Sequence, residues 1–144
     1  MYQEIDGPSA AFASLFNAIV APRPIGWISS ISEQGVANLA PFSYFNAISP
    51  SPPMVVFSCN GTVADGRQKD TIENVRRIPE FVANFAAWDL REQMNASSAS
   101  VPFDTDEFDL AGLERAAGRR VRPPLVAAAP ANLECQVVKI VDLP

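Results

Sequence analysis

The chain has 144 residues, of which 48% are hydrophobic and 19% are charged, with no apolar run long enough to cross a membrane. These values exclude a disordered, highly charged chain and predict one soluble globular domain over residues 1–144. The formal net charge of −5 argues against general affinity for nucleic acid, so neither nucleic acid nor a membrane is expected as a partner.

The first half of the chain alternates a helix with strands. Apolar residues at helical spacing predict an amphipathic helix over 8–20, which two nearby prolines end. Residues 25–31 and 36–43, joined by a polar turn that contains glycine, predict a β-hairpin. The compact apolar run 54–59 predicts a buried strand.

The second half mixes shorter elements. Asp70 and Glu73 resemble a capping box and predict a helix that continues through Arg77. Four further elements are expected: a strand over 80–86, a helix over 89–95, a helix over 110–117 that ends at Gly118, and a last strand over 133–143. That last strand is apolar on both faces, so its burial should come from a second subunit or from residues beyond this chain.

The order of these elements bears on the fold class. At least four strands in hairpin order, with short helices between them, favour a β-barrel or α+β fold over a parallel doubly wound sheet. Neither GxGxxG nor GxxxxGK occurs, which disfavours Rossmann and P-loop units.

Histidine is absent, which removes the usual general base of Ser/His/Asp and Cys/His hydrolases and the commonest transition-metal ligand. Cys59 and Cys135 form no cluster and are expected to be reduced core residues, and no metal site is predicted. If the protein is an enzyme, its chemistry therefore belongs to a bound organic cofactor. The N-terminus has no secretory pattern, so a cytoplasmic location is expected.

Residues 67–75, RQKDTIENV, place Arg67 and Lys69 at the start of a predicted helix. Free amides at a helix N-terminus, a lysine and the Thr71 hydroxyl could together bind a phosphate. The alternative is that Asp70 caps the helix and Lys69 is a solvated surface charge, and the local pattern alone favours this alternative.

Residues 38–46, NLAPFSYFN, read as a strand that contains Pro41, which belongs at an edge or a bulge because proline donates no ladder hydrogen bond. Free backbone there could face the polar edge of a planar heterocycle such as a flavin, with Ser43 and Asn46 adding side-chain groups. The alternative is a bulged strand whose aromatic residues fill the core.

Two charged runs are interpreted as surface features. The basic run comprises Arg115, Arg119, Arg120 and Arg122, and the acidic run comprises Asp104, Asp106, Glu107 and Asp109. The basic run could bind the adenosine phosphate of NADPH but is expected to be a solvated helix end. The acidic run lacks the sequence pattern of a calcium-binding loop and is expected to be a surface turn.

Four motifs in order resemble the flavin reductase-like, FMN-binding split-barrel family. They are PRPIGWISS at 22–30, NLAPFSYFNAISPSPPMVVFS at 38–58, KDTIENV at 69–75 and EFVANF at 80–85. The resemblance covers nearly the whole chain. It implies a mainly β, Greek-key-like split barrel with short helices, and a homodimer that holds FMN near the subunit interface.

The resemblance also implies which residues contact the cofactor. Lys69 and Thr71 would contact the phosphate with Asn84 nearby, whereas Trp27 is expected in the core. The remaining flavin-site positions are Arg23, Pro24, Ser29, Ser30, Asn38, Leu39, Ala40, Ser43, Phe45 and Asn46.

The implied activity is hydride transfer from NADH or NADPH to the flavin, and then electron transfer to oxygen, a partner monooxygenase or another acceptor. The alternative is a non-enzymatic FMN-binding electron carrier that resembles flavoredoxin. Members of the family that we recognise continue beyond the segment matching LECQVVKIVDLP. The barrel is therefore expected either to be truncated or to have its open edge covered in the dimer.

Overall fold

The computed structural model describes residues 10–61, 66–103 and 105–142. Its centre is an antiparallel sheet of four strands in the order β2-β1-β5-β8. These strands span Gly26–Ile31 (β1), Ala37–Phe42 (β2), Glu80–Asn84 (β5) and Asn132–Gln136 (β8).

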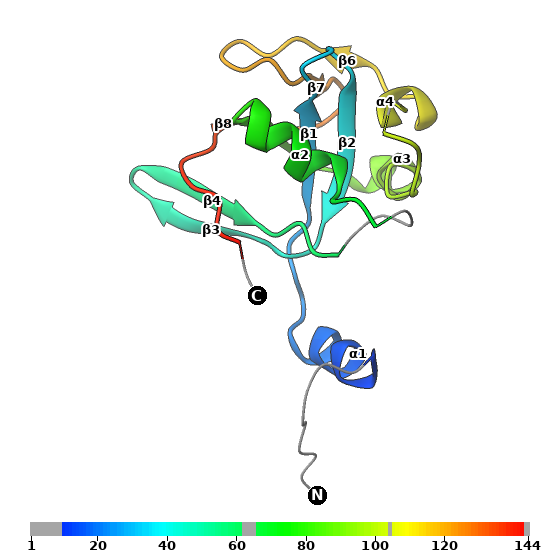
Figure 1. Cartoon of the computed structure of the whole chain (residues 1–144), viewed down its shortest axis with the longest axis vertical. Helices are drawn as coiled ribbons and strands as arrows, with labels where there is room; N and C mark the ends of the chain where they lie inside the picture. Colours follow the sequence, from blue (N-terminus) through cyan, green and yellow to red (C-terminus); the bar gives the residue numbers. More distant parts are fainter. Residues whose placement is uncertain (1–9, 62–65, 104, 143–144) are drawn as a thin grey trace, which may run out of the picture.

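In the described part of the chain, two smaller antiparallel ribbons and four short helical segments lie around this sheet, and a fifth helix lies apart from it (Figure 1). The ribbons pair β3 (Phe45–Pro50) with β4 (Pro53–Phe57) and β6 (Arg115–Ala116) with β7 (Leu125–Val126). The helical segments are α1 (Ala10–Ile19), α2 (Asp70–Arg77), the 3-10 turn η1 (Trp88–Leu90), α3 (Arg91–Ala96) and α4 (Glu107–Leu110). The fold is mainly β with short helices, and within the described residues the sheets do not close into one barrel, which confirms the predicted split barrel.

The strand alternation of β1 builds two cores, because successive side chains point to opposite faces of the sheet. Trp27 packs with Leu39 and Phe108 on the face that α4 covers. Ile28 packs on the other face with Phe42 and with residues from α2 and β5. Both Trp27 and Ile28 are fully buried.

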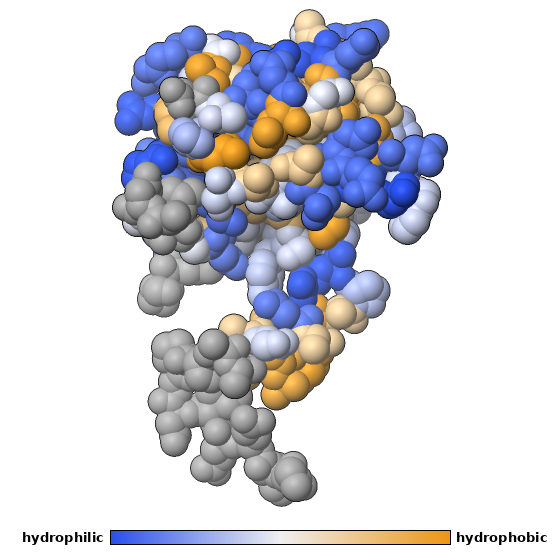
Figure 2. Space-filling model, turned by 90° about the vertical axis from the view of Figure 1, so that its right-hand side faces the viewer, coloured by the Kyte–Doolittle hydropathy of each residue, from blue (hydrophilic) through white to orange (hydrophobic). Residues whose placement is uncertain are grey.

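The first helix, α1, lies apart from the sheet (Figure 1). Its apolar stripe stays exposed: Leu15, Phe16 and Val20 are partly accessible, and Ile19 is 70% exposed. Figure 2 shows hydrophobic residues gathered on this helix below the main body.

Most predicted elements are confirmed within a few residues at their ends. The hairpin 25–31/36–43 corresponds to β1 and β2, and the helices expected at 8–20, 70–77 and 89–95 correspond to α1, α2 and the η1–α3 pair. Pro41 lies on β2 at the edge of the central sheet, as predicted.

Three predictions of secondary structure are wrong. The helix expected at 110–117 is instead α4, which ends at Leu110 because Gly112 takes a positive φ of 64°. The strand expected at 133–143 pairs only to Gln136, opposite Glu80, where its partner β5 begins. The strand expected to be buried at 54–59 lies in a ribbon with β3, and its burial is partial because that ribbon pairs with no further strand among the described residues.

Candidate functional site

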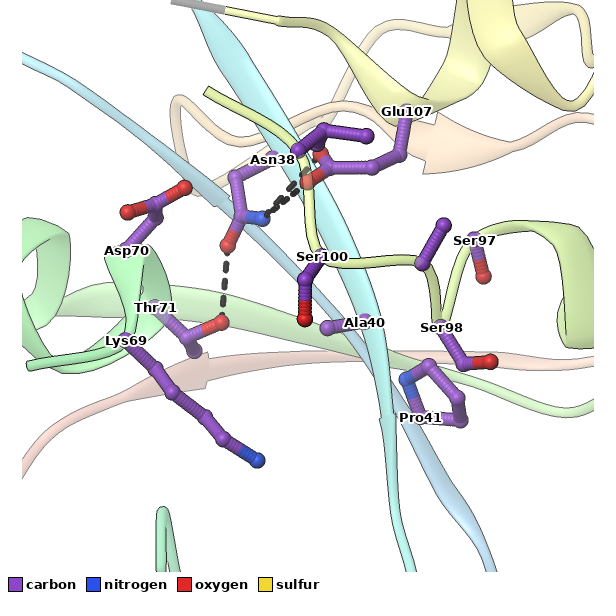
Figure 3. A pocket seen from close by; sticks show the side chains of 12 residues that line it. Asn38, Ala40, Pro41, Lys69, Asp70, Thr71, Ser97, Ser98, Ser100 and Glu107 are labelled. Atoms are coloured by element: carbon purple, nitrogen blue, oxygen red, sulfur yellow. Dashed lines mark hydrogen bonds between the residues drawn. The ribbon is translucent and has the colours of Figure 1, made fainter. Parts of the chain in front are cut away.

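A cavity of about 230 Å³ lies between the start of α2, the edge strand β2 and the segment 97–101 (Figure 3). Three lining residues, Asn38, Ala40 and Pro41, belong to β2, where proline leaves the sheet edge without a donor. The remaining lining residues are Lys69, Asp70, Thr71, Ser97, Ser98, Ala99, Ser100, Val101 and Glu107. Four predicted site residues, Asn38, Ala40, Lys69 and Thr71, therefore meet at one cavity.

Lys69 is the cation of this cavity. It immediately precedes α2, and its Nζ lies 5.4 Å from the centroid of the Phe42 ring. No carboxylate of the described residues lies within ion-pair distance of Lys69. Its charge and the first amides of α2 can therefore act on an anion in the cavity.

The predicted capping role of Asp70 is wrong. The N-cap residue is Lys69, which makes no side-chain cap, and Asp70 is the first helical residue. The helix dipole stabilises a carboxylate at this position, and Asp70 also forms an ion pair with Arg67, with 3.7 Å between the charged atoms.

Asn38 is the centre of a buried hydrogen-bond network. Its Nδ2 donates to both carboxylate oxygens of Glu107 at 3.1 Å, and the Leu39 backbone N–H donates to Glu107 Oε2 at 2.9 Å. Its Oδ1 accepts from Thr71 Oγ1 at 2.7 Å (Figure 3) and from Ser30 Oγ at 3.0 Å. Asn74 of α2 completes the network, because its Nδ2 donates to Ser30 Oγ at 3.1 Å.

Glu107 corrects the prediction that the acidic run is a surface turn. Its side chain is only 3% exposed, while Asp106 caps α4 by accepting from the Phe108 N–H, and Asp104 lies outside the described residues. Burial raises the pKa of Glu107. The hydrogen bonds from Leu39 and Asn38 oppose that rise, and the negative charge of Asp70 adds to it.

The wall formed by 97–101 is fixed by a contact with the core. Trp27 Nε1 donates to Ser97 Oγ at 2.8 Å, and Ser97 Oγ in turn donates to the Met94 carbonyl at 2.8 Å. Both Trp27 and Ser97 are buried, which confirms the expected core role of Trp27.

Two other predicted site residues, Ser29 and Asn84, face a different part of the protein. Ser29 Oγ donates to the Pro124 carbonyl at 2.5 Å. Asn84 Nδ2 donates to the Trp27 carbonyl at 3.0 Å, and its Oδ1 accepts from the Val126 N–H at 2.9 Å. Within this chain these side chains hold the segment around β7 against the sheet and do not line the cavity.

The remaining predicted residues also lie outside the cavity. Arg23 follows α1, donates to the Asn17 and Val20 carbonyls at 2.8 Å and stacks 5.3 Å from the centroid of the Tyr44 ring. Pro24 follows it, while Ser43, Phe45 and Asn46 lie at the turn into β3 and on that strand.

The basic run is not a helix end, because no helix forms over 111–120. Arg115 lies on β6 and pairs with Asp106 at 2.9 Å and with Asp109 at 2.7 Å. The backbone N–H groups of Arg119, Arg120 and Val121 instead donate to the carboxylate of Glu134.

Both cysteines carry free, partly buried thiols, and burial raises the pKa of Cys59 to about 12. Across 10–61, 66–103 and 105–142, no group of three or more cysteine and carboxylate side chains is placed to hold a metal ion. In the same part of the chain, every helix is too short or too polar to span a membrane.

Sequence reasoning missed Glu107 and the serine wall of the cavity. The run NASSAS at 95–100 gave a weak signal for the wall, since it predicted only a loop. Nothing local marks Glu107, because its partner Asn38 is 69 positions away.

Comparison with known proteins gives three kinds of match. Residues 20–143 match the family model described as flavin reductase like domain. An uncharacterized protein of Deinococcus radiodurans is 40% identical over 140 residues, which cover 94% of this chain and 61% of that protein.

Two solved structures superpose on the whole chain. Nitrilotriacetate monooxygenase component B from Bacillus cereus has a TM-score of 0.92 and 26% identity, with 72% of its chain covered. The 2-nitrobenzoate 2-nitroreductase of Pseudomonas fluorescens has a TM-score of 0.85 and 25% identity, with 68% of its chain covered. The chain spans between 54% and 70% of the length of five curated relatives that it matches.

Proposed function

The chain belongs to the flavin reductase-like domain family, and from that premise we propose that it binds FMN and transfers hydride from NADH or NADPH through it. The observation that carries this proposal is the position of Lys69, an ammonium group that lines the cavity beside the first amides of α2. A cation that has no carboxylate partner among the residues the structure describes fits, at that place, the phosphate of FMN.

The donor set of the cavity fits a flavin in other respects. β2 is the edge strand of the sheet, and the Pro41 carbonyl on its free side can accept a hydrogen bond from the edge of the ring system, whereas Pro41 has no N–H to donate. The side chains of Ser98 and Ser100 on the opposite wall add hydroxyl groups that suit the ribityl chain (Figure 3).

The size of the cavity supports a second part of the proposal, a homodimer. A volume of about 230 Å³ falls below the roughly 300–1,000 Å³ of sites that enclose a whole ligand of this size. We propose that a second subunit completes the site and that the exposed apolar stripe of α1 contributes to the contact. Sedimentation of wild type against Ile19→Asp tests this, and a monomer at micromolar concentration in both proteins would contradict it.

Bound flavin supplies the hydride and electron chemistry, so the chain needs no imidazole for that step. The tasks of its own residues are to hold the phosphate at Lys69, to orient the ring against β2 and to exclude water through the wall at 97–101. The similarity to nitrilotriacetate monooxygenase component B of B. cereus favours a partner monooxygenase as the final acceptor of electrons.

Anaerobic rapid mixing of the FMN-loaded protein with NADH and with NADPH tests the proposed activity. Loss of the visible absorbance of the flavin at about 1–10³ s⁻¹ with either nucleotide is the expected result. Reduction that occurs only when a redox protein is added would support the electron carrier and contradict the proposed activity.

A further inference from the structure

The buried network around Asn38 allows only one direction for its hydrogen bonds. The Leu39 N–H and the Asn38 side chain both approach the Glu107 carboxylate, and an ionised carboxylate can only accept. The amide nitrogen of Asn38 must therefore face Glu107, and its oxygen must face the opposite way, toward Thr71 (Figure 3) and toward Ser30.

This direction decides what Thr71 can do. A threonine hydroxyl has one proton, and Thr71 gives it to Asn38 Oδ1 at 2.7 Å. Ser30 gives its own proton to the same oxygen and accepts from Asn74, so it cannot replace Thr71 as a donor toward the cavity. Thr71 is also only 1% exposed.

We infer that Glu107 is a positioning residue of this site, because it fixes the Asn38 amide so that the Thr71 hydroxyl proton points toward Asn38 and away from the cavity. Of the Lys69 and Thr71 side chains, only Lys69 can then donate a hydrogen bond to an anion in the cavity. Thr71 can then only accept a hydrogen bond from a bound ligand. This inference rests on the proposed function, and it assigns the preference for a phosphorylated flavin to Lys69 and not to Thr71.

Few charged groups surround Glu107 among the described residues. The charged groups on the cavity are Lys69, which precedes α2, and Asp70, its first residue, whereas β2 and the segment 97–101 carry none. Asp106, next to Glu107 in the chain, is paired with Arg115. Protonation of Glu107 would place an O–H where Asn38 needs an acceptor, which is why the carboxylate controls the orientation of the amide.

Binding of FMN and riboflavin to Thr71→Val tests the inference, because valine keeps the shape of threonine and removes the hydroxyl. The ratio of FMN affinity to riboflavin affinity should stay within threefold of wild type in Thr71→Val, and in the control Thr71→Ser, and should fall at least tenfold in Lys69→Ala. A fall of more than threefold in Thr71→Val alone would show that Thr71 donates to the phosphate and would overturn the inference.

A second measurement does not depend on flavin binding, so it separates failure of this inference from failure of the proposed function. The NMR signals of the Asn38 side-chain NH₂ should shift with pH in wild type and in Asp70→Asn, with a midpoint above that of an ordinary glutamate. Glu107→Gln should abolish this titration. Signals that ignore pH in wild type, or that titrate equally in Glu107→Gln, would overturn the inference.

Discussion

The hydrogen bond between Trp27 and Ser97 gives a sharp test of how the cavity wall is held. Both residues are buried, and Trp27 Nε1 donates to Ser97 Oγ at 2.8 Å. Ser97→Ala removes the acceptor and leaves the indole N–H buried without a partner. An orphaned buried donor costs about 1–3 kcal/mol of the free energy of unfolding, which corresponds to about 2–4 °C in melting temperature for each kcal/mol in a chain of this size.

The assay is equilibrium unfolding in urea at neutral pH, with Ser98→Ala as the matched control. Ser98 is exposed and donates to the Asn95 carbonyl at 2.6 Å, so its loss should change the free energy of unfolding by less than about 0.5 kcal/mol. In a Trp27→Phe background the donor is absent, and Ser97→Ala should then cost about 1 kcal/mol less than it does in wild type. Equal stabilities of Ser97→Ala and Ser98→Ala, or strictly additive effects with Trp27→Phe, would refute the reasoning.

Three further predictions concern the core, a thiol and a loop. Phe81→Ala should lower the free energy of unfolding by about 3–5 kcal/mol, because Phe81 is buried with its ring 5.0 Å from that of Phe57; a loss under about 1 kcal/mol in urea unfolding would contradict this. Burial raises the pKa of Cys59 to about 12, so in a Cys135→Ser background Cys59 should react with maleimide at pH 8 at least tenfold more slowly in the folded protein than in urea. Equal rates in the two conditions would contradict this prediction. Hydrogen bonds from three backbone N–H groups lower the pKa of Glu134, so the stability that its carboxylate contributes is present above the ordinary pKa of 4.5 and is lost as pH falls through the lowered pKa. The difference in urea midpoint between wild type and Glu134→Gln should therefore shrink in acid. A difference that does not depend on pH would contradict this prediction.

Local periodicity was sufficient for the elements that bury one regular face. The hairpin of β1 and β2 and the helix α2 follow from alternation and from helical spacing. The strand β3 was missed because the prolines at 50, 52 and 53 make its end look like a loop, although Pro50 and Pro53 close a ribbon. The prediction of a helix over 110–117 placed its end at Gly118 and was wrong, because Gly112 takes a positive φ and the helix ends before it.

The site was predictable only where its residues lie close together in the sequence. Lys69 and Thr71 mark the start of a helix, and Ala40 lies beside the proline that marks a sheet edge. Glu107 was not predictable, because an acidic residue in an acidic run is normally solvated and only tertiary contact with Asn38 buries it. The same holds for Ser97, whose partner in the core lies 70 positions away.

Fluorescence titration of FMN and riboflavin against wild type, Lys69→Ala and Arg77→Ala tests the central claim most directly. Arg77 lies at the opposite end of α2 and pairs with Glu33 on the surface, so it controls for loss of one positive charge. The account predicts that wild type and Arg77→Ala quench FMN fluorescence with equal affinity. Lys69→Ala should bind FMN about 10- to 150-fold more weakly, the equivalent of about 1.5–3 kcal/mol for a hydrogen bond to a charged group, with riboflavin nearly unaffected. Equal losses for both flavins in Lys69→Ala, or no quenching of FMN by wild type, would contradict it.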